Sequence, residues 1–278
     1  MIEFRISVSR HVGCGFTPSF LTLLAGAIST SIALVSVATA ADITARDFAL
    51  KLKTASVEAP LDVSDQDLSF LDLSSLNFKH AILTGVDLYG TDLTEADLSY
   101  VELSDTRIDR AVIIGTDFSH ANLEAAEINL PTTSRDLSFR TSETAKFNGA
   151  NLTGARVLAR LHGADFRKAI LRNADFSALS PGTATIASVP RNYLIGANFD
   201  GADLRNANFS YANMNFSTFI GADLRGANFS SAELVKADFT GAKLDGAIFK
   251  NADLRDLKGG KLLVSEVDGA MPLATAQP

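Results

Sequence analysis

Residues 221–249, GADLRGANFSSAELVKADFTGAKLDGAIF, carry a large apolar side chain at every fifth position. These central residues are Leu224, Phe229, Leu234, Phe239, Leu244 and Phe249. A period of five matches neither the 3.6 residues of a helix nor the strict two of a long strand. The pattern therefore indicates a short extended segment followed by a turn, repeated along the chain.

The same period extends over most of the sequence. Fourteen repeats run from Val63 to Ile128 and thirteen run from Leu194 to Leu254. Between these blocks the phase slips twice, and two short blocks are centred on Phe147, Leu152 and Val157 and on Phe166, Leu171 and Phe176. In the last block, the residue two places before the centre is Ala in eleven of thirteen repeats, with Asn192 and Ser217 as the exceptions.

These positions predict which side chains point inward. Side chains alternate along an extended segment, so the central residue and the Ala two places before it share one face. Gly, Asn and Ser, which are frequent two places after the centre, favour turns. Such units bury their apolar face only by stacking on their neighbours, and this stacking is typical of a solenoid.

The order of the central residues indicates the number of sides in each coil. From Phe199 onward, Phe recurs with a period of ten. Four repeats per coil would stack Phe199, Phe219 and Phe239 in one column and Phe209, Phe229 and Phe249 in another, whereas three would place Phe on Leu. The sequence therefore favours a square coil of twenty residues.

The tandem motif A-[DN]-[LF]-x-x resembles that of the pentapeptide repeat family, for example at residues 222–226 (ADLRG) and 197–201 (ANFDG). The resemblance covers most of residues 61–256. It implies an all-β fold, a right-handed quadrilateral β-helix with Leu and Phe inward. The thirty-three repeats then give roughly eight coils and a length of about 40 Å at ~4.8 Å per coil.

The sequence outside the repeats predicts the remaining organisation. Residues 41–60 are expected to form an N-terminal cap, with a short helix that covers the first coil through Ile43, Phe48 and Leu52. Repeat block 1 spans 61–130, an interrupted region with loops at 129–145 and 178–192 spans 131–191, and block 2 spans 192–256. A C-terminal cap or tail, residues 257–278, contains Leu262, Leu263 and Val264, which could cover the last coil, as could a second molecule.

Residues 1–40 have the features of a secretory signal peptide. Arg5 and Arg10 precede an uncharged, largely apolar run at 20–37, and Ala38-Thr39-Ala40 forms a small-x-small cleavage pattern. We expect cleavage before Ala41 and export to the periplasm or an equivalent compartment, with an uncleaved membrane anchor as the alternative. Since the only cysteine, Cys14, lies in this leader, the mature chain has no thiol chemistry.

No combination of residues predicts catalysis. Outside the leader the histidines are His80, His120 and His162, in three separate stretches, and no phosphate-binding loop, zinc motif or nucleophile motif accompanies them. Regularly spaced carboxylates could in principle bind Ca²⁺, but they lack the clustered Gly-x-Asp pattern of calcium-binding repeats. We therefore expect no catalytic, cofactor-binding or metal-binding residues and no cofactor.

Charge and apolar residues indicate where a partner could bind. Residues 61–130 hold 14 acidic and 3 basic side chains, which form either a partner surface or the solvated outside of a rod. A coil of twenty would align Asp67, Asp87 and Glu127, interrupted by Arg107. The candidate partner residues are a basic set near the phase slip (Arg156, Arg160, Arg167, Lys168 and Arg172) and an apolar set expected on one face (Tyr193, Ile195, Phe216 and Val235).

These observations predict a non-enzymatic, exported structural or protein-interaction module with an unknown protein partner. An acidic exported chain has no general reason to bind nucleic acid, and no membrane span remains after signal cleavage. A homodimer, formed end to end or through one face, is possible. Two alternatives stay open: a gyrase-binding DNA mimic, as in cytoplasmic family members, which the leader disfavours, and an accessory or scaffold protein for an envelope enzyme that uses its loops. The loops could equally be tolerated insertions.

Overall fold

The computed structural model describes residues 41–79, 81–135, 140–178 and 191–259. Residues 1–38 and 39–278 form two separate units, and all described residues belong to the second. The predicted leader, the middle of both loops and most of the C-terminal tail, including Leu262, Leu263 and Val264, lie outside the described residues.

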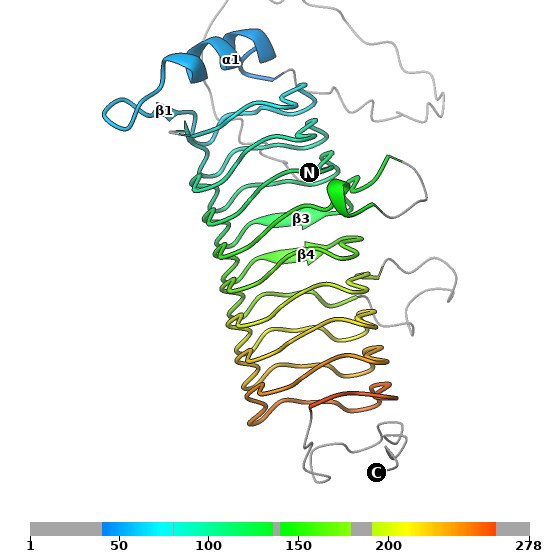
Figure 1. Cartoon of the computed structure of the whole chain (residues 1–278). Helices are drawn as coiled ribbons and strands as arrows, with labels where there is room; N and C mark the ends of the chain where they lie inside the picture. Colours follow the sequence, from blue (N-terminus) through cyan, green and yellow to red (C-terminus); the bar gives the residue numbers. More distant parts are fainter. Residues whose placement is uncertain (1–40, 80, 136–139, 179–190, 260–278) are drawn as a thin grey trace, which may run out of the picture. The chain divides into compact units, whose positions relative to one another are not determined.

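The described chain coils as a four-sided solenoid whose consecutive coils are hydrogen-bonded in parallel (Figure 1). We call the coils levels 1–9 and the sides A–D. On each side, the residue that precedes the central one pairs with the equivalent residue of the next level. In order from level 1 to level 9, side A pairs Asp62, Ile82, Glu102, Asn122, Asn151, Ile170, Asp203, Asp223 and Lys243; side B pairs Asp67, Asp87, Arg107, Glu127, Arg156, Asp175, Asn208, Asn228 and Ile248. Side D pairs Asn77, Asp97, Asp117, Lys146, Asp165, Asn198, Thr218, Asp238 and Lys258.

Side C differs, because its ladder is interrupted. It pairs Asp72, Asp92, Val112 and Thr132, and then separately Arg160, Tyr193, Asn213, Glu233 and Asp253. Among the described residues, Thr132 of level 4 does not pair with Arg160 of level 5. Levels 1–4 and levels 5–9 are therefore joined by three continuous ladders and divided on the fourth side.

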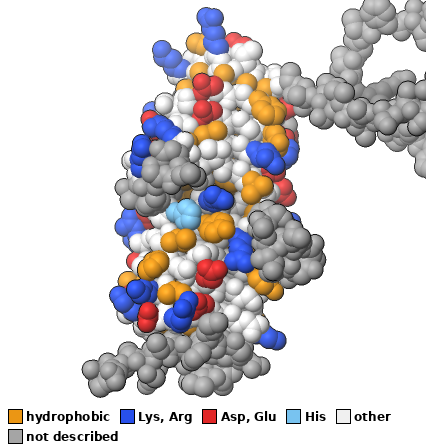
Figure 2. Space-filling view, turned by 90° about the vertical axis from the view of Figure 1, so that its right-hand side faces the viewer, with side chains coloured by type: hydrophobic (Ala, Val, Ile, Leu, Met, Phe, Trp, Pro, Cys, Tyr) orange, Lys and Arg blue, Asp and Glu red, His pale blue; other side chains and the backbone are white. Residues whose placement is uncertain are grey.

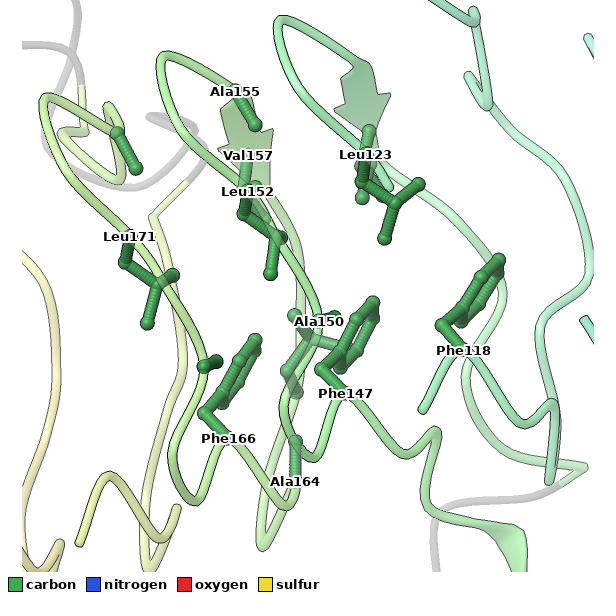
Figure 3. Close-up of a cluster of buried hydrophobic side chains, with 14 of the residues drawn as sticks. Phe118, Leu123, Phe147, Ala150, Leu152, Ala155, Val157, Ala164, Phe166 and Leu171 are labelled. Atoms are coloured by element: carbon green, nitrogen blue, oxygen red, sulfur yellow. The ribbon is translucent and has the colours of Figure 1, made fainter. Parts of the chain in front are cut away.

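The core confirms the inward and outward positions predicted from the sequence. The central residues of both blocks are buried except Leu244, which is partly buried, and nearly all Ala residues two places before them are buried. Both predicted Phe columns are present: Phe199, Phe219 and Phe239 stack with ring centroids 5.2 and 4.6 Å apart. Farther up the same column, Phe118, Phe147 and Phe166 stack at 5.1 and 4.8 Å beside a column of Leu side chains (Figure 3). These spacings match the ~4.8 Å between hydrogen-bonded strands.

Nearly every described corner of the coil is made by a residue in the left-handed region; the exceptions are Arg135, Ala159 and Ala178, which lie beside the insertions and the missing residue. Two places after the centre φ lies near +60°, both at Gly, such as Gly226, and at residues with bulky side chains, such as Phe70, Tyr100 and Phe216. A non-glycine residue there costs about 1–2 kcal/mol. The ladder hydrogen bonds on both sides of the corner hold this conformation, so the turn does not depend on glycine.

Regular strands are short because the chain turns at every side. The strands β1 (Leu61–Asp62) and β2 (Ala81–Ile82) pair on side A, and β3 (Glu127–Asn129) and β4 (Arg156–Leu158) pair on side B. A 3-10 helix, η1 (Thr141–Glu143), belongs to the first loop and projects from the solenoid in Figure 1.

The predicted N-terminal cap is helix α1 (Ala45–Thr54), which lies across level 1 (Figure 1). Thr44 caps it by accepting a hydrogen bond from the Asp47 amide. The helix buries Phe48 and Leu52, and the Phe48 ring lies 5.5 Å from that of Phe78. The first coil is therefore covered by the chain's own apolar residues.

The described residues form nine levels, one more than the sequence count of roughly eight. The spacing between paired residues is 20 along most of the chain, but it is 29 from Asp117 to Lys146, 19 from Asn151 to Ile170, and 33 from Arg160 to Tyr193. Two further central positions were not counted in the sequence. Thr133 follows Ile128 by five residues but is polar, and Leu161 follows Val157 by only four because one residue is missing.

Candidate partner-binding surface

Side C of levels 5–8 brings the predicted apolar residues together. Tyr193 and Ile195 lie on level 6, Phe216 at the corner after side C on level 7, and Val235 on level 8. Phe216 is 55% exposed, and Tyr193, Ile195 and Val235 are partly exposed. The expectation that these four residues share one face is confirmed, and we call them and their neighbours on levels 5–8 the side-C surface.

Two cations of the side-C surface rest on aromatic rings. The Arg160 guanidinium lies 5.4 Å from the centre of the Tyr193 ring, and the Lys236 Nζ lies 5.9 Å from the centre of the Phe216 ring. Such contacts stabilise by about 0.5–1 kcal/mol at exposed sites. In the described part of the chain, neither Arg160 nor Lys236 forms an ion pair, so their charges remain available to a partner.

The carboxylate of Glu233 on this surface is already engaged. It accepts hydrogen bonds from Arg191 at 3.1 Å and from the Asn213 amide at 2.6 Å. Arg191 therefore offsets the charge of Glu233, and the surface keeps a net positive charge from Arg160 and Lys236.

A histidine that was not selected from the sequence lies on the same surface. The ring of His162, which is half-buried, lies 5.9 Å from the Tyr193 ring. Burial, and then the nearby Arg160, lowers the pKa of His162. Its surroundings therefore favour the neutral form of the ring.

The predicted basic residues do not form one patch. Arg156 lies on side B, Arg160 on side C, Arg167 and Lys168 on side D and its corner, and Arg172 on side A. Arg167 pairs with Asp165 at 2.6 Å and Arg172 with Asp203 at 2.7 Å. These residues are close in sequence but separate in space, because one coil distributes a stretch of twenty residues over four sides. Of this set, only Arg160 belongs to the side-C surface.

The acidic residues of the first block are aligned as predicted. Asp67, Asp87 and Glu127 follow one another on side B, interrupted by Arg107. Arg107 pairs with Asp87 at 3.1 Å and with Asp109 at 3.0 Å. This ladder is therefore partly neutralised rather than uniformly acidic.

Both sequence interruptions lie at the edges of side C. The chain leaves side C after Ser134 and returns on side D at Ala145, and it leaves side B after Ala178 and returns on side C at Asn192. The two loops thus flank the interrupted ladder. Loops on a rigid scaffold are where binding residues concentrate.

Asn192 joins levels 5 and 6 where the chain returns from the second loop. Its buried amide donates hydrogen bonds of 2.7 Å to the Val157 and Phe176 carbonyls, and its Oδ1 accepts one of 2.7 Å from the Ala159 amide. Regular corners satisfy the central carbonyl by a backbone amide, as Ala227 does for Leu224. Val157 precedes the missing residue and Phe176 precedes the second loop, so among the described residues neither carbonyl meets the usual backbone amide. The side chain of Asn192 takes the place of both amides. Ala could not do this, which explains why this position is not Ala.

The described residues contain a pocket, but no cluster of metal-binding side chains and no membrane-spanning helix. A shallow pocket of about 230 Å³ lies beside the second loop, lined by Asn129, Arg156, Val157, Leu158, Ser177 and Ala178. No group of three or more potential metal-ligating His, Cys, Asp or Glu residues occurs within the described ranges. Within the same ranges, no helix is long and apolar enough to cross a membrane. On the face shown in Figure 2, positive, negative and hydrophobic side chains are intermingled.

Fold and surface define a β-solenoid repeat protein. The sequence matches the profile of the pentapeptide repeat region over residues 194–268 and that of pentapeptide repeats (eight copies) over 72–109, 92–128 and 158–178. The chain belongs to the pentapeptide repeat family, and its fold is the right-handed quadrilateral β-helix that the sequence resemblance implied.

Solved structures with the same fold are similar to this chain at low identity. QnrB1, a plasmid-mediated fluoroquinolone resistance protein, is 17% identical, with 76% of this chain and 91% of that one covered and a TM-score of 0.41. HetL, a protein involved in heterocyst differentiation regulation from the cyanobacterium Nostoc, is 28% identical, with 72% and 92% covered and a TM-score of 0.30. A pentapeptide repeat protein from the thylakoid lumen of Arabidopsis thaliana is 26% identical, with 41% and 70% covered and a TM-score of 0.23. No curated protein sequence matches the chain.

Proposed function

We propose that this protein is a non-enzymatic, exported protein-interaction module that binds its partner through the side-C surface. The observation that carries the proposal is the gathering of Tyr193, Ile195, Phe216 and Val235 beside two cations that form no ion pair with any described residue. Tyr, Phe and Arg are enriched in the cores of protein interfaces. The rigid ladders behind them hold these side chains in place before a partner arrives.

The backbone conformation and exposure of Phe216 support a role for this residue in binding the partner protein. It is exposed and occupies a left-handed corner (φ +63°), where Gly lies one level above it at position 196. A bulky residue at such a corner carries a conformational cost. Free energy gained when Phe216 contacts a partner would offset the conformational cost of placing a bulky residue at this corner.

Site-specific photocrosslinking tests the surface directly. A photoreactive phenylalanine replaces Ile195 or Val235 on side C or, as matched controls at the same position of the repeat, Ser230 on side B or Thr240 on side D. We expect discrete adducts with one or a few proteins from the side-C positions only. Equal adducts from all four positions, or none from side C, would overturn the proposal.

The proposal that the protein is exported is based on the leader sequence, residues 1–40, and can be tested separately. N-terminal sequencing of the protein from fractionated cells should find a start at Ala41 in the exported fraction. A full-length chain in the cytoplasm would refute export and would favour the gyrase-binding alternative.

The gyrase-binding alternative requires an acidic surface that resembles DNA. The acidic ladder of side B is broken by Arg107, with its two ion pairs, and continues to Arg156. Tight binding of the chain without residues 1–40 to purified gyrase would support this alternative against our proposal.

The accessory-protein alternative places binding in the loops. A variant lacking residues 136–144 removes most of the first loop, keeps Thr132 in its ladder, and gives Asp117 and Lys146 the regular spacing of 20 residues. Retention of the side-C adducts by this variant would locate recognition on the solenoid face, whereas their loss would assign it to the loop.

A further inference from the structure

The side-C surface has a definite arrangement of charge and apolar contact. At one end lies Arg160 on Tyr193, and at the other end lies Lys236 beside Phe216. Between them the surface presents Ile195 on level 6 and Val235 on level 8. The surface is therefore positive at both ends, and between the ends these apolar side chains lie beside the polar Asn213, Asn215 and Glu233.

The spacing of the two cations follows from the ladder. Arg160 belongs to level 5 and Lys236 to level 8, so three steps of ~4.8 Å separate their backbones by about 14 Å along the solenoid. An extended peptide rises about 3.3 Å per residue, and its residues i, i+2 and i+4 face the same side over about 13 Å. Arg160 precedes the centre of its side by one residue and Lys236 follows the centre by two, at the corner, so their backbones are also offset across side C. An extended segment that crosses side C obliquely therefore lets carboxylates on residues i and i+4 reach the two cations.

From this arrangement, and resting on the proposed function, we propose that the side-C surface recognises an extended acidic segment of its partner protein with the pattern acid-x-apolar-x-acid. The first carboxylate pairs with Arg160, the last with Lys236, and the apolar residue between them packs on Ile195, Phe216 and Val235. Glu233 does not repel the segment, because Arg191 and Asn213 already hold its carboxylate.

Polyanions fit this surface less well. Nucleic acids and anionic lipid surfaces are bound by many cations that release counterions together. Arg160 and Lys236 are only two charges, and the third cation, Arg191, is paired with Glu233 at 3.1 Å. The apolar contact between the two charges favours a protein segment.

A peptide titration tests the pattern. The probe is a labelled nine-residue peptide, TTETVTETT, titrated by fluorescence anisotropy into the chain purified from the cells that produce it. One control peptide, TTKTVTKTT, reverses the charges; another, TTEVTTETT, keeps the two acids at the same spacing but moves the single apolar residue to the opposite face. We expect saturable binding of the first peptide below about 1 mM and at least about tenfold weaker binding of both controls.

Matched variants locate the binding. Arg160→Gln together with Lys236→Gln should weaken peptide binding by about tenfold or more. Arg225→Gln together with Lys243→Gln removes two charges from side A, where both cations contact Asp223, and should leave binding unchanged. Absence of saturable binding, equal binding of the control peptides, or equal loss in both double variants would overturn the proposal.

The outcomes separate this inference from the proposed function. Side-C photoadducts without peptide binding would leave the interaction surface in place and reject the acidic pattern. If the Arg160→Gln, Lys236→Gln variant instead dissociates a dimer in sedimentation and binds no peptide, the occupant is a second copy of this chain and the inference fails.

Discussion

Levels 1–4 and levels 6–9 have the same backbone but different cores and surfaces. The central residues of side B are Leu68, Leu88, Ile108 and Ile128 in the first region and Phe176, Phe209, Phe229 and Phe249 in the second, and all are buried. The ladder hydrogen bonds are nevertheless equivalent, because both aliphatic side chains and parallel stacked rings fit a ~4.8 Å repeat. The fold therefore requires large apolar side chains at the centres and does not require aromatic ones.

The surfaces of the two regions differ in how their carboxylates are held. On level 1, Asp62 and Asp72 accept hydrogen bonds from Ser64 and Ser74, whereas on levels 7–9 Asp203, Asp223 and Asp253 pair with Arg205, Arg225 and Arg255. The same Asp position caps the turn in both regions and leaves the neighbouring residue free to set the charge. The outward side chains can therefore vary without a change in the backbone of the coil. This allows one side of the solenoid to carry a surface that differs from the others.

The largest expected effect comes from a charge in the core of the second region. Phe229→Asp places a carboxylate between the rings of Phe209 and Phe249, 5.3 and 5.1 Å from Phe229, and should cost more than about 4 kcal/mol. Since each level contacts only its neighbours, hydrogen exchange should show loss of protection in levels 7–9 and retained protection in levels 1–3. Uniform loss over both regions would contradict the claim that they are stabilised locally.

Asn192→Ala should have the next largest effect, because it leaves two carbonyls and one amide unsatisfied where the two regions meet. We expect a loss of about 2–4 kcal/mol in chemical denaturation. Ser217→Ala is the control, since Ser217 donates one hydrogen bond to the Leu194 carbonyl and should cost about 1 kcal/mol. Equal losses in the two variants would mean that Asn192 has no special role at the interruption.

Low pH should weaken the second region through protonation of Asp203. Hydrogen bonds from Arg205, and then from Arg172, lower the pKa of Asp203 to about 2. Because the folded-state pKa is below the unfolded one, the stabilisation is present above about pH 4 and is lost as the pH falls through about 2. In Arg205→Gln, NMR titration should find the pKa of Asp203 raised by about one unit; an unchanged pKa would show that Arg205 does not hold the carboxylate.

The smallest expected effect is that of an outward residue in the same region as Phe229. Asp223→Ala removes a surface pair with Arg225 at 2.7 Å and the turn cap. Thermal denaturation should show a decrease in Tm of no more than about 4 °C. A decrease as large as that of Phe229→Asp would refute the assignment of inward and outward positions.

Much of this architecture was predictable from the sequence because the period of five is directly visible. It identified the core residues of both blocks, the two Phe columns, the N-terminal cap and the shared face of Tyr193, Ile195, Phe216 and Val235. The left-handed corners were predictable at Gly226 but not at Tyr100, where the ladder overrides the ordinary preference of the side chain.

The interrupted region was harder to predict for a physical reason. Once a residue is missing between Val157 and Leu161, the sequence no longer indicates which side a residue occupies. The basic set therefore could not be placed, and Leu161 was missed as a central residue. The exceptional Asn192 was visible as a departure from Ala, but its role depends on carbonyls of Val157 and Phe176, which only the fold brings together.

The central claim is that the same ladders continue through the interruption with a shifted register. In a chain begun at Ala41, which contains no cysteine, Asn151→Cys with Ile170→Cys should form a disulfide on mild oxidation, because these residues pair directly across adjacent levels. Asn151→Cys with Arg172→Cys should remain reduced, since two residues of offset place the Cα atoms about 8 Å apart. Equal oxidation of both pairs, or oxidation of the second pair alone, would contradict the structure described for this region.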